Sequence, residues 1–158
     1  MKSIVYTIGD ATKPKGAGNK IIAHVCNDIG AWGKGFVLAL SKLSPVPERS
    51  FKEWYRERDH NDFALGAVQF VSVSSEILVA NMIGQHGIRV LRGVPPIRYD
   101  AVETALGKVG LKARTDNASV HLPRIGCGLA GGSWSRIEPL IEQQICERGV
   151  PVFVYDLS

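Results

Sequence analysis

A regular alternation between short apolar runs and longer helical segments constrains the fold of this chain more than any other feature. Six runs rich in β-branched residues predict strands, and they lie at residues 3–8, 20–26, 66–74, 76–83, 118–125 and 150–157. Only Ser75 separates the third run from the fourth, which predicts an antiparallel hairpin. Helical segments separate the other runs, as in β-α-β units, so we expect a mixed, mostly parallel six-stranded sheet.

The segments between these runs show helical periodicity. They predict helices at residues 34–44, 47–59, 98–113 and 133–149. In the last of these, Ile137, Ile141 and Ile145 recur at helical spacing, while Ser133 is expected to cap the start and Gly149 to mark the end. Helices on both faces of a twisted sheet predict a three-layer α/β/α sandwich, and such sheets bind ligands at the carboxyl ends of their strands.

Length and composition describe an ordinary globular protein. The chain fits one domain, predicted to cover residues 1–158, with 45% hydrophobic and 22% charged residues. No apolar run approaches the roughly 20 residues of a membrane span, and the N-terminus lacks the pattern of a secretory signal. We therefore expect a cytoplasmic protein that does not enter membranes.

Cysteines, histidines and charge exclude several classes of function. Cys26, Cys127 and Cys146 are odd in number and far apart, so neither a disulfide framework nor a zinc site is predicted. His24 and His121 alternate with apolar neighbours and are expected to be core or hydrogen-bonding residues rather than metal ligands. The net charge of +4 favours anionic partners mildly, without the clustered Lys/Arg stripes typical of nucleic-acid binding. We expect no metal, no cofactor and no specific nucleic-acid partner.

A glycine-rich stretch, Gly126 to Gly131, follows the fifth predicted strand and precedes the last predicted helix. Its letters, GCGLAG, fit the dinucleotide-binding fingerprint G-x-G-x-x-G, with Asp156 ending the next strand. Only about 30 residues follow it, too few to complete a mononucleotide-binding half. The P-loop pattern fails because Gly132 occupies the lysine position, and a thiol phosphatase would need arginine where Ser133 stands.

A second glycine-rich turn follows the second predicted strand. Residues 26–36 read CNDIGAWGKGF, with three glycines around Trp32 and Lys34. Glycines allow backbone N–H groups to converge, and a helix start adds partial positive charge, so each turn can form an anion cradle. Two such loops at neighbouring strand ends could hold a diphosphate between them. The alternative is a pair of tight strand-to-helix turns.

Three motifs together resemble the macrodomain family, which binds ADP-ribose. The family's first ligand loop resembles IIAHVCNDIGAWGKGF, in a variant form with H-x-C-N and W-G-x-G in place of N-A-A-N and G-G-G. Its second ligand loop resembles LPRIGCGLAGGSW, and its G-D-[IA]-T motif resembles YTIGDAT. The motifs occur in the expected order over nearly the whole chain. The chain is most similar to the branch of terminal ADP-ribose protein glycohydrolase and ADP-ribose 1''-phosphate phosphatase.

The resemblance implies roles for particular residues. Asp10 would accept a hydrogen bond from the adenine amino group, with the Ala11 N–H nearby, and Asn27 would bond the distal ribose hydroxyls. The two loops would hold the ribose and the diphosphate, and Tyr155 would pack on adenine unless it is a half-buried strand tyrosine. The implied ligand-binding set is Asp10, Ala11, Asn27, Trp32, Gly33, Lys34, Gly35, Phe36, Ile125, Gly126, Cys127, Gly128, Leu129, Ala130 and Tyr155.

The sequence departs from the glycohydrolase pattern where the chemistry should be. The resemblance implies a lysine after the fourth strand and an aspartate in the second ligand loop, whereas Gln85 and Ala130 stand at the matching positions. A covalent lysine mechanism is therefore not supported. Gln85 or His86 could orient a water instead, with Asn27 and the ligand's own hydroxyls and diphosphate assisting at the anomeric carbon.

We therefore predict a hydrolase that binds ADP-ribose and cleaves ADP-ribose linked to protein acidic side chains or to a terminal phosphate, which would reverse ADP-ribosylation. Its catalytic residues would be Asn27, Gln85 and His86, and its partners ADP-ribose or ADP-ribosylated protein. A non-catalytic ADP-ribose reader module is the alternative, favoured by the missing lysine and aspartate. A small oxidoreductase is the third candidate, and it predicts tighter binding of NAD(H) than of ADP-ribose. We expect a monomer.

Overall fold

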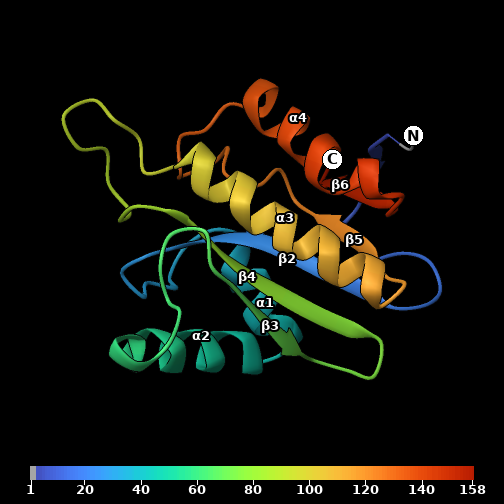
Figure 1. Cartoon of the computed structure of the whole chain (residues 1–158), viewed down its shortest axis with the longest axis horizontal. Coiled ribbons are helices and arrows are strands. Elements are labelled where there is room, and N and C mark those ends of the chain that lie inside the picture. Colours follow the sequence, from blue (N-terminus) through green and yellow to red (C-terminus); the bar gives the residue numbers. More distant parts are fainter. Residues whose placement is uncertain (1–2) are drawn as a thin grey trace.

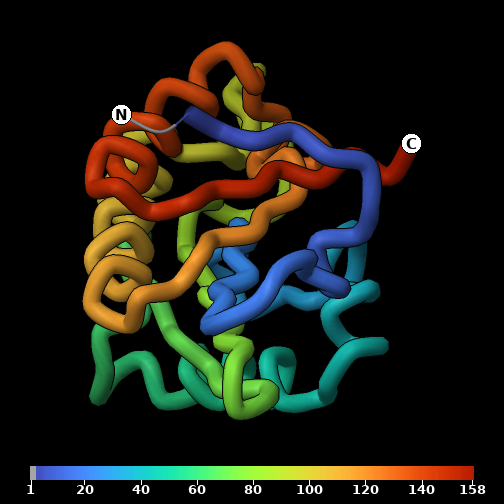
Figure 2. Tube along the Cα trace, turned by 90° about the vertical axis from the view of Figure 1, so that its right-hand side faces the viewer, coloured from blue at the N-terminus to red at the C-terminus, as the bar shows by residue number. Residues whose placement is uncertain are grey.

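The computed structural model describes residues 3–158 and contains a six-stranded sheet, as predicted. The strands are β1 (Val5–Ile8), β2 (Lys20–Asn27), β3 (Val68–Ser72), β4 (Ile77–Gln85), β5 (Ser119–Leu122) and β6 (Val152–Asp156). Their order across the sheet is β1-β6-β5-β2-β4-β3, so Figure 2 shows strands far apart in the sequence lying side by side. Only β3 and β4 pair in antiparallel fashion, which confirms the predicted hairpin and the mostly parallel sheet.

Helices cover both faces of the sheet (Figure 1), which confirms the three-layer α/β/α sandwich. The expectation of a helical segment between the first two runs is wrong, because the described residues between β1 and β2 form no helix. One face carries α1 (Phe36–Leu43) and α2 (Val46–Arg56), and the other carries α3 (Tyr99–Thr115) and α4 (Trp134–Gln144). Across residues 3–158, none of these helices has the length and apolar character needed to cross a membrane.

Several predicted ends differ from the observed ones for local reasons. The fifth strand ends at Leu122 rather than residue 125, because Pro123 has no N–H to donate to a neighbouring strand. The last helix ends at Gln144 and continues as a short 3₁₀ turn, which Gly149 closes with a φ of 80°. Ser133 does lie at the N-cap position, but the predicted side-chain cap is wrong, because its Oγ is 2.8 Å from the Oγ of Ser135 instead.

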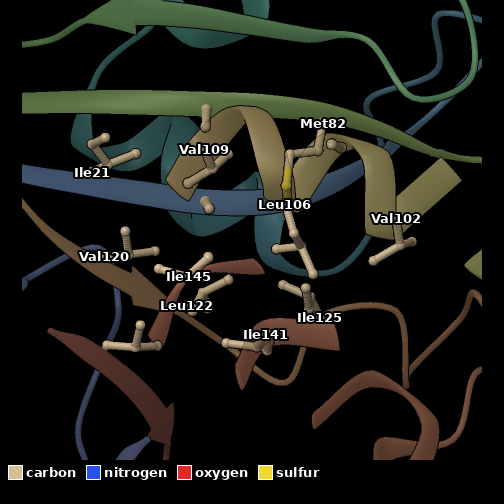
Figure 3. Packing of buried hydrophobic residues seen from close by; sticks show 14 of the residues in the cluster. Ile21, Met82, Val102, Leu106, Val109, Val120, Leu122, Ile125, Ile141 and Ile145 are labelled. Atoms are coloured by element: carbon tan, nitrogen blue, oxygen red, sulfur yellow. The ribbon is translucent and has the colours of Figure 1, made fainter. Parts of the chain in front are cut away.

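Two hydrophobic cores, one on each face, hold the layers together. Figure 3 shows the larger core, where side chains of β2, β4 and β5 meet those of α3 and α4. The smaller core joins the opposite face of the sheet to Phe51 and Trp54 of α2. Along β2, Ile21 enters the first core and Ile22 the second, both with no exposed surface. This central strand is therefore buried on both faces, as parallel strands under two helical layers must be.

Two histidines are buried inside this framework and, as predicted, make hydrogen bonds there. His24 Nε2 donates to Asn81 Oδ1 at 2.6 Å. His121 has its ring nitrogens 2.8 Å from the hydroxyls of Tyr155 and Ser119. Burial lowers the pKa of His24 to about 4, and burial together with the charge of Lys20 lowers the pKa of His121 to about 4. Both rings are therefore neutral at neutral pH.

These depressed values predict that the protein loses stability in mild acid. The unfolded chain, where a histidine has a pKa near 6.5, takes up protons before the folded chain does as the pH falls. We expect the free energy of unfolding to be constant above about pH 6.5 and to fall towards pH 4, by about 2 kcal/mol per histidine at pH 5. Urea unfolding at a series of pH values measures this slope. His121→Gln should flatten the slope and exposed His60→Gln should not, so equal slopes in both variants would contradict the assignment.

Candidate functional site

The parallel strands bring the predicted motifs to one edge of the sheet. Strands β5, β2 and β4 are neighbours and run in the same direction, so the chain leaves all three at the same edge. The segments that follow them are residues 123–133, 28–35 and 86–98. The first two are the glycine-rich loops, which therefore lie next to each other, as the sequence predicted.

A cleft with two adjoining cavities lies at this edge. One cavity, of about 210 Å³, is lined by residues of both glycine loops, including Gly35 and Gly128. The other, of about 310 Å³, is lined by Asn27, Trp32 and Ile88 among others. The two cavities share five lining residues, which makes them parts of one cleft, and these are Val25, Lys34, Val37, Gln85 and Leu129. The combined space is of the size usual for small-molecule sites.

The second glycine loop presents unpaired backbone donors to the first cavity. Its own bonds hold its shape, since Gly131 N–H donates to the carbonyl of Gly128 at 3.0 Å and Gly132 N–H to the carbonyl of Gly126 at 2.7 Å. Within residues 3–158, the N–H groups of Gly128, Leu129 and Ala130 find no acceptor. Since all three residues line the cavity, this loop can bind an anion through its backbone.

Two glycines of this loop have opposite surroundings. Gly126 has a φ of 71°, and a Cβ added there would lie 2.8 Å from Ile97 Cδ1, so only glycine fits. Around Gly128, by contrast, an added Cβ meets nothing within 4 Å. A side chain at Gly128 would therefore extend into the open cleft without disturbing the fold.

Asn27 organises the first glycine loop. Its Oδ1 accepts hydrogen bonds from the N–H groups of Ile29 and Ala31 at 3.1 and 3.0 Å, and its Nδ2 donates to the carbonyl of Ala31 at 2.8 Å. The loop then reaches Gly35, whose φ of 80° starts α1 without a side-chain cap. Consequently the first N–H groups of α1 stay open at the cleft, where the exposed side chain of Lys34 adds positive charge.

Asp28 ties the segment after β4 to the first glycine loop. Its carboxylate accepts hydrogen bonds from Gly87 N–H and from His86 Nδ1, both at 2.7 Å. Sequence reasoning missed Asp28, because its partners are 58 and 59 residues away and no spacing reveals them. Of the predicted catalytic residues, Asn27 and Gln85 line the cleft, while the ring of His86 lies beside it and is half exposed.

The residues predicted for adenine lie just after β1, in the case of Asp10 and Ala11, and on the neighbouring strand β6, in the case of Tyr155. Asp10 follows β1, and its Oδ1 accepts from the N–H and hydroxyl of Thr12 at 2.8 and 2.7 Å. Although burial alone raises the pKa of Asp10, these bonds lower it overall. Ala11 and Tyr155 are 2% and 4% exposed. Tyr155 is thus a buried strand residue rather than a half-buried one, and within the described chain none of the three lines either cavity.

Arg124 is a second residue that the sequence did not single out. It lines the smaller cavity and donates two hydrogen bonds of 2.9 Å to the carboxylate of Asp156. Its guanidinium also lies 5.0 and 4.9 Å from the ring centres of Tyr6 and Trp134. The ion pair lowers the pKa of Asp156. Arg124 follows β5 and Asp156 ends β6, so the two residues meet only because these strands are neighbours in the sheet.

Cys127 lacks the environment of a nucleophile. Burial raises the pKa of its thiol, although Arg124 opposes this, and its Sγ donates to the carbonyl of Ile125 at 3.3 Å. A reactive cysteine needs a lowered pKa. Over the part of the chain that the structure describes, no three His, Cys, Asp or Glu side chains gather as metal ligands would.

This geometry defines a class, the α/β/α sandwiches with a cleft of open backbone N–H groups at the carboxyl ends of parallel strands. A macrodomain protein from Streptomyces coelicolor is 58% identical to this chain, with a TM-score of 0.88 over 98% of this chain and 99% of that one. A protein of unknown function from Bacteroides thetaiotaomicron is 54% identical, with a TM-score of 0.95 over 98% of both chains. The chain therefore belongs to the macrodomain family. No protein-family model matches it.

Other relatives are larger or more distant. Mouse (Mus musculus) chromodomain-helicase-DNA-binding protein 1-like is 33% identical over 97% of this chain, which spans only 18% of that protein's length. An ADP-ribose 1''-phosphate phosphatase from Lodderomyces elongisporus is 22% identical over 78% of this chain and 79% of its own length. Thermosipho africanus DarTG in complex with ADP-ribose is 16% identical, with a TM-score of 0.77 over 98% of this chain and 42% of that one, and shares the fold.

The role of Asn27 in the first loop leads to a test of stability. Asn27→Ala removes three hydrogen bonds from a residue that is 8% exposed, so we expect the free energy of unfolding to fall by about 2–3 kcal/mol. Asn19 is the control, because it precedes the same strand but is exposed and makes one bond, to the carbonyl of Asp116. Urea unfolding should show a loss below about 1 kcal/mol for Asn19→Ala. Equal losses would mean that Asn27 does not organise the loop.

Proposed function

We propose that this chain binds ADP-ribose in the cleft and hydrolyses ADP-ribose linked to an acidic side chain or to a terminal phosphate. One observation carries the proposal, namely the unpaired N–H groups of two glycine loops that line one cavity. Family membership supports it, as does the ADP-ribose bound to DarTG. The name of the phosphatase from Lodderomyces elongisporus supports the choice of a phosphate-linked substrate.

The cleft suggests how the ligand lies. The diphosphate would sit between the open N–H groups of residues 128–130 and the start of α1, with Lys34 nearby. The distal ribose would enter the larger cavity beside Asn27 and Trp32. Adenine would extend towards Asp10, whose carboxylate can accept from its exocyclic amine. The linked acceptor group would leave the cleft near Gln85.

The proposed chemistry is attack of water on the anomeric carbon. The bond to the acceptor oxygen breaks and the acceptor leaves with the electron pair. Water supplies the hydroxyl of the free ADP-ribose, and its second proton passes to the released acceptor or to solvent. Gln85 lines both cavities and can orient this water through its side-chain amide. Positioned acid-base groups typically contribute about 10²–10⁴-fold to such a step, so modest turnover needs no lysine.

A reader module that binds ADP-ribose without turnover is the second candidate. Gln85 and Ala130 occupy the positions where the glycohydrolase pattern has its lysine and aspartate, and Ala130 is only 4% exposed. An oxidoreductase is disfavoured by the sheet, because its order differs from the 3-2-1-4-5-6 of the dinucleotide-binding fold.

Gly128→Glu tests the binding site. The new carboxylate would repel the diphosphate and occupy the open N–H groups, so we expect ADP-ribose binding to weaken by about 100-fold or more. The melting temperature should stay within about 2 °C, because nothing surrounds this position. Calorimetry with ADP-ribose and NAD⁺ measures both affinities. Gly128→Ala serves as the control and should bind nearly normally, whereas normal binding by Gly128→Glu would show that the cradle is misplaced.

Turnover separates the enzyme from the reader module. We expect Gln85→Ala to lower release of glutamate-linked ADP-ribose by about 10²-fold without changing the Kd of ADP-ribose. His86→Ala should have a smaller effect, because His86 lies beside the cleft rather than in it. The assay compares serine-, glutamate- and phosphate-linked substrates. If the wild-type protein releases no more ADP-ribose than Gly128→Glu does, the hydrolase is contradicted and the reader module is the function that remains.

A further inference from the structure

The segment after β4 carries an exposed apolar face. Residues 86–98, here named the β4–α3 loop, project beyond the strand ends, where Figure 1 draws them in yellow-green at the left. Four of its aliphatic side chains, those of Ile88, Val90, Leu91 and Val94, are 49–62% exposed. Single exposed aliphatic residues are common, but here four lie within seven positions of one loop, and contiguous exposed apolar patches often mark interaction sites.

This loop is held in shape without a partner. The carboxylate of Asp28 fixes its start at His86 and Gly87. A tight turn closes its tip, because the N–H groups and carbonyls of Leu91 and Val94 bond each other in both directions at 3.0 and 2.9 Å. A preformed surface loses little conformational entropy when it binds, which favours docking of a partner here.

The charge of the loop indicates the kind of partner. Arg89 and Arg92 are exposed between the aliphatic residues, and neither forms an ion pair within the described part of the chain. A nucleic-acid surface would add lysines or aromatic rings for stacking, but the stretch GIRVLRGVP has neither. Guanidinium groups beside aliphatic side chains match a polypeptide that offers carboxylates and apolar residues.

The loop is continuous with the proposed ligand site. Ile88 lines the larger cavity together with Asn27 and Trp32, where the distal ribose would lie. A group attached to that ribose must therefore leave the cleft beside the β4–α3 loop. We propose that residues 88–94 dock the acidic and apolar stretch of polypeptide that surrounds the ADP-ribosylated side chain. This inference rests on the proposed function, because it takes linked ADP-ribose to occupy the cleft.

Charge reversal in the loop tests the inference. The probe is a peptide with an ADP-ribosylated residue in a non-hydrolysable linkage, flanked by glutamates and leucines. We expect the double variant Arg89→Glu/Arg92→Glu to weaken binding of this peptide by about 10-fold, while the Kd of free ADP-ribose changes by less than about 2-fold. A peptide with lysines in place of the glutamates should bind the double variant more tightly than the wild type. Leu91→Ser should also weaken peptide binding but not ADP-ribose binding.

The matched control is Arg49→Glu/Arg114→Glu, which makes the same change in net charge at exposed arginines on α2 and α3. The control should leave peptide binding unchanged. If it loses as much peptide affinity as the loop variant does, net charge alone explains the effect, and the docking surface is overturned. The surface is also overturned if the loop variant binds the peptide as well as the wild type does. If the loop variant loses affinity for an ADP-ribosylated oligonucleotide but not for the peptide, the proposed polypeptide partner is wrong. Failure of the wild type to bind free ADP-ribose would instead overturn the proposed function, and the docking inference with it.

Discussion

The site depends on the parallel pairing of β2 with both of its neighbours. Hydrogen bonds join β2 to β5 on one side and to β4 on the other, with all three strands in the same direction. Because β2 is buried under helices on both faces, a slip by one residue would send Ile21 and Ile22 into the wrong cores. The register is therefore firmly specified. It sets the position of every loop at the cleft.

Hydrogen bonds within the two glycine loops hold their shape and leave other backbone N–H groups of the loops without an acceptor. The side chain of Asn27 hydrogen-bonds the backbone of the first loop, and two backbone hydrogen bonds stabilise the second loop. The N–H groups at residues 128–130 therefore keep their positions although they have no acceptor. A buried N–H without a partner costs free energy, but at a cleft water or an anion can bind it. Donors held in this way would bind a ligand phosphate, as proposed above, with little rearrangement.

Sequence patterns predict the parts of this protein that depend on local order. The alternation of runs identified the sheet and the β3–β4 hairpin, and the clustered glycines identified the two loops, because all of these follow from periodicity or from residues near in the chain. The pairs Asp28–His86 and Arg124–Asp156 were missed, since each needs the order of strands in the finished sheet. The Ser133 cap was predicted wrongly, because a neighbouring hydroxyl competes for the same side chain.

The ionisable groups around the cleft bear on which linkage the proposed hydrolysis would cleave. Among the described residues that line the two cavities there is no carboxylic acid, and His24, with a pKa of about 4, cannot donate a proton at neutral pH. Glycosidases with carboxylate pairs use one of them to protonate the leaving oxygen. In the proposed hydrolysis, this lining would best suit a leaving group that accepts the electron pair without a proton from a carboxylic acid. A carboxylate, whose conjugate acid has a pKa near 4.3, does so readily, as does a phosphate, whereas a serine alkoxide does not. If the chain hydrolyses linked ADP-ribose as proposed, the composition of the cleft would favour ester- and phosphate-linked ADP-ribose over the serine linkage.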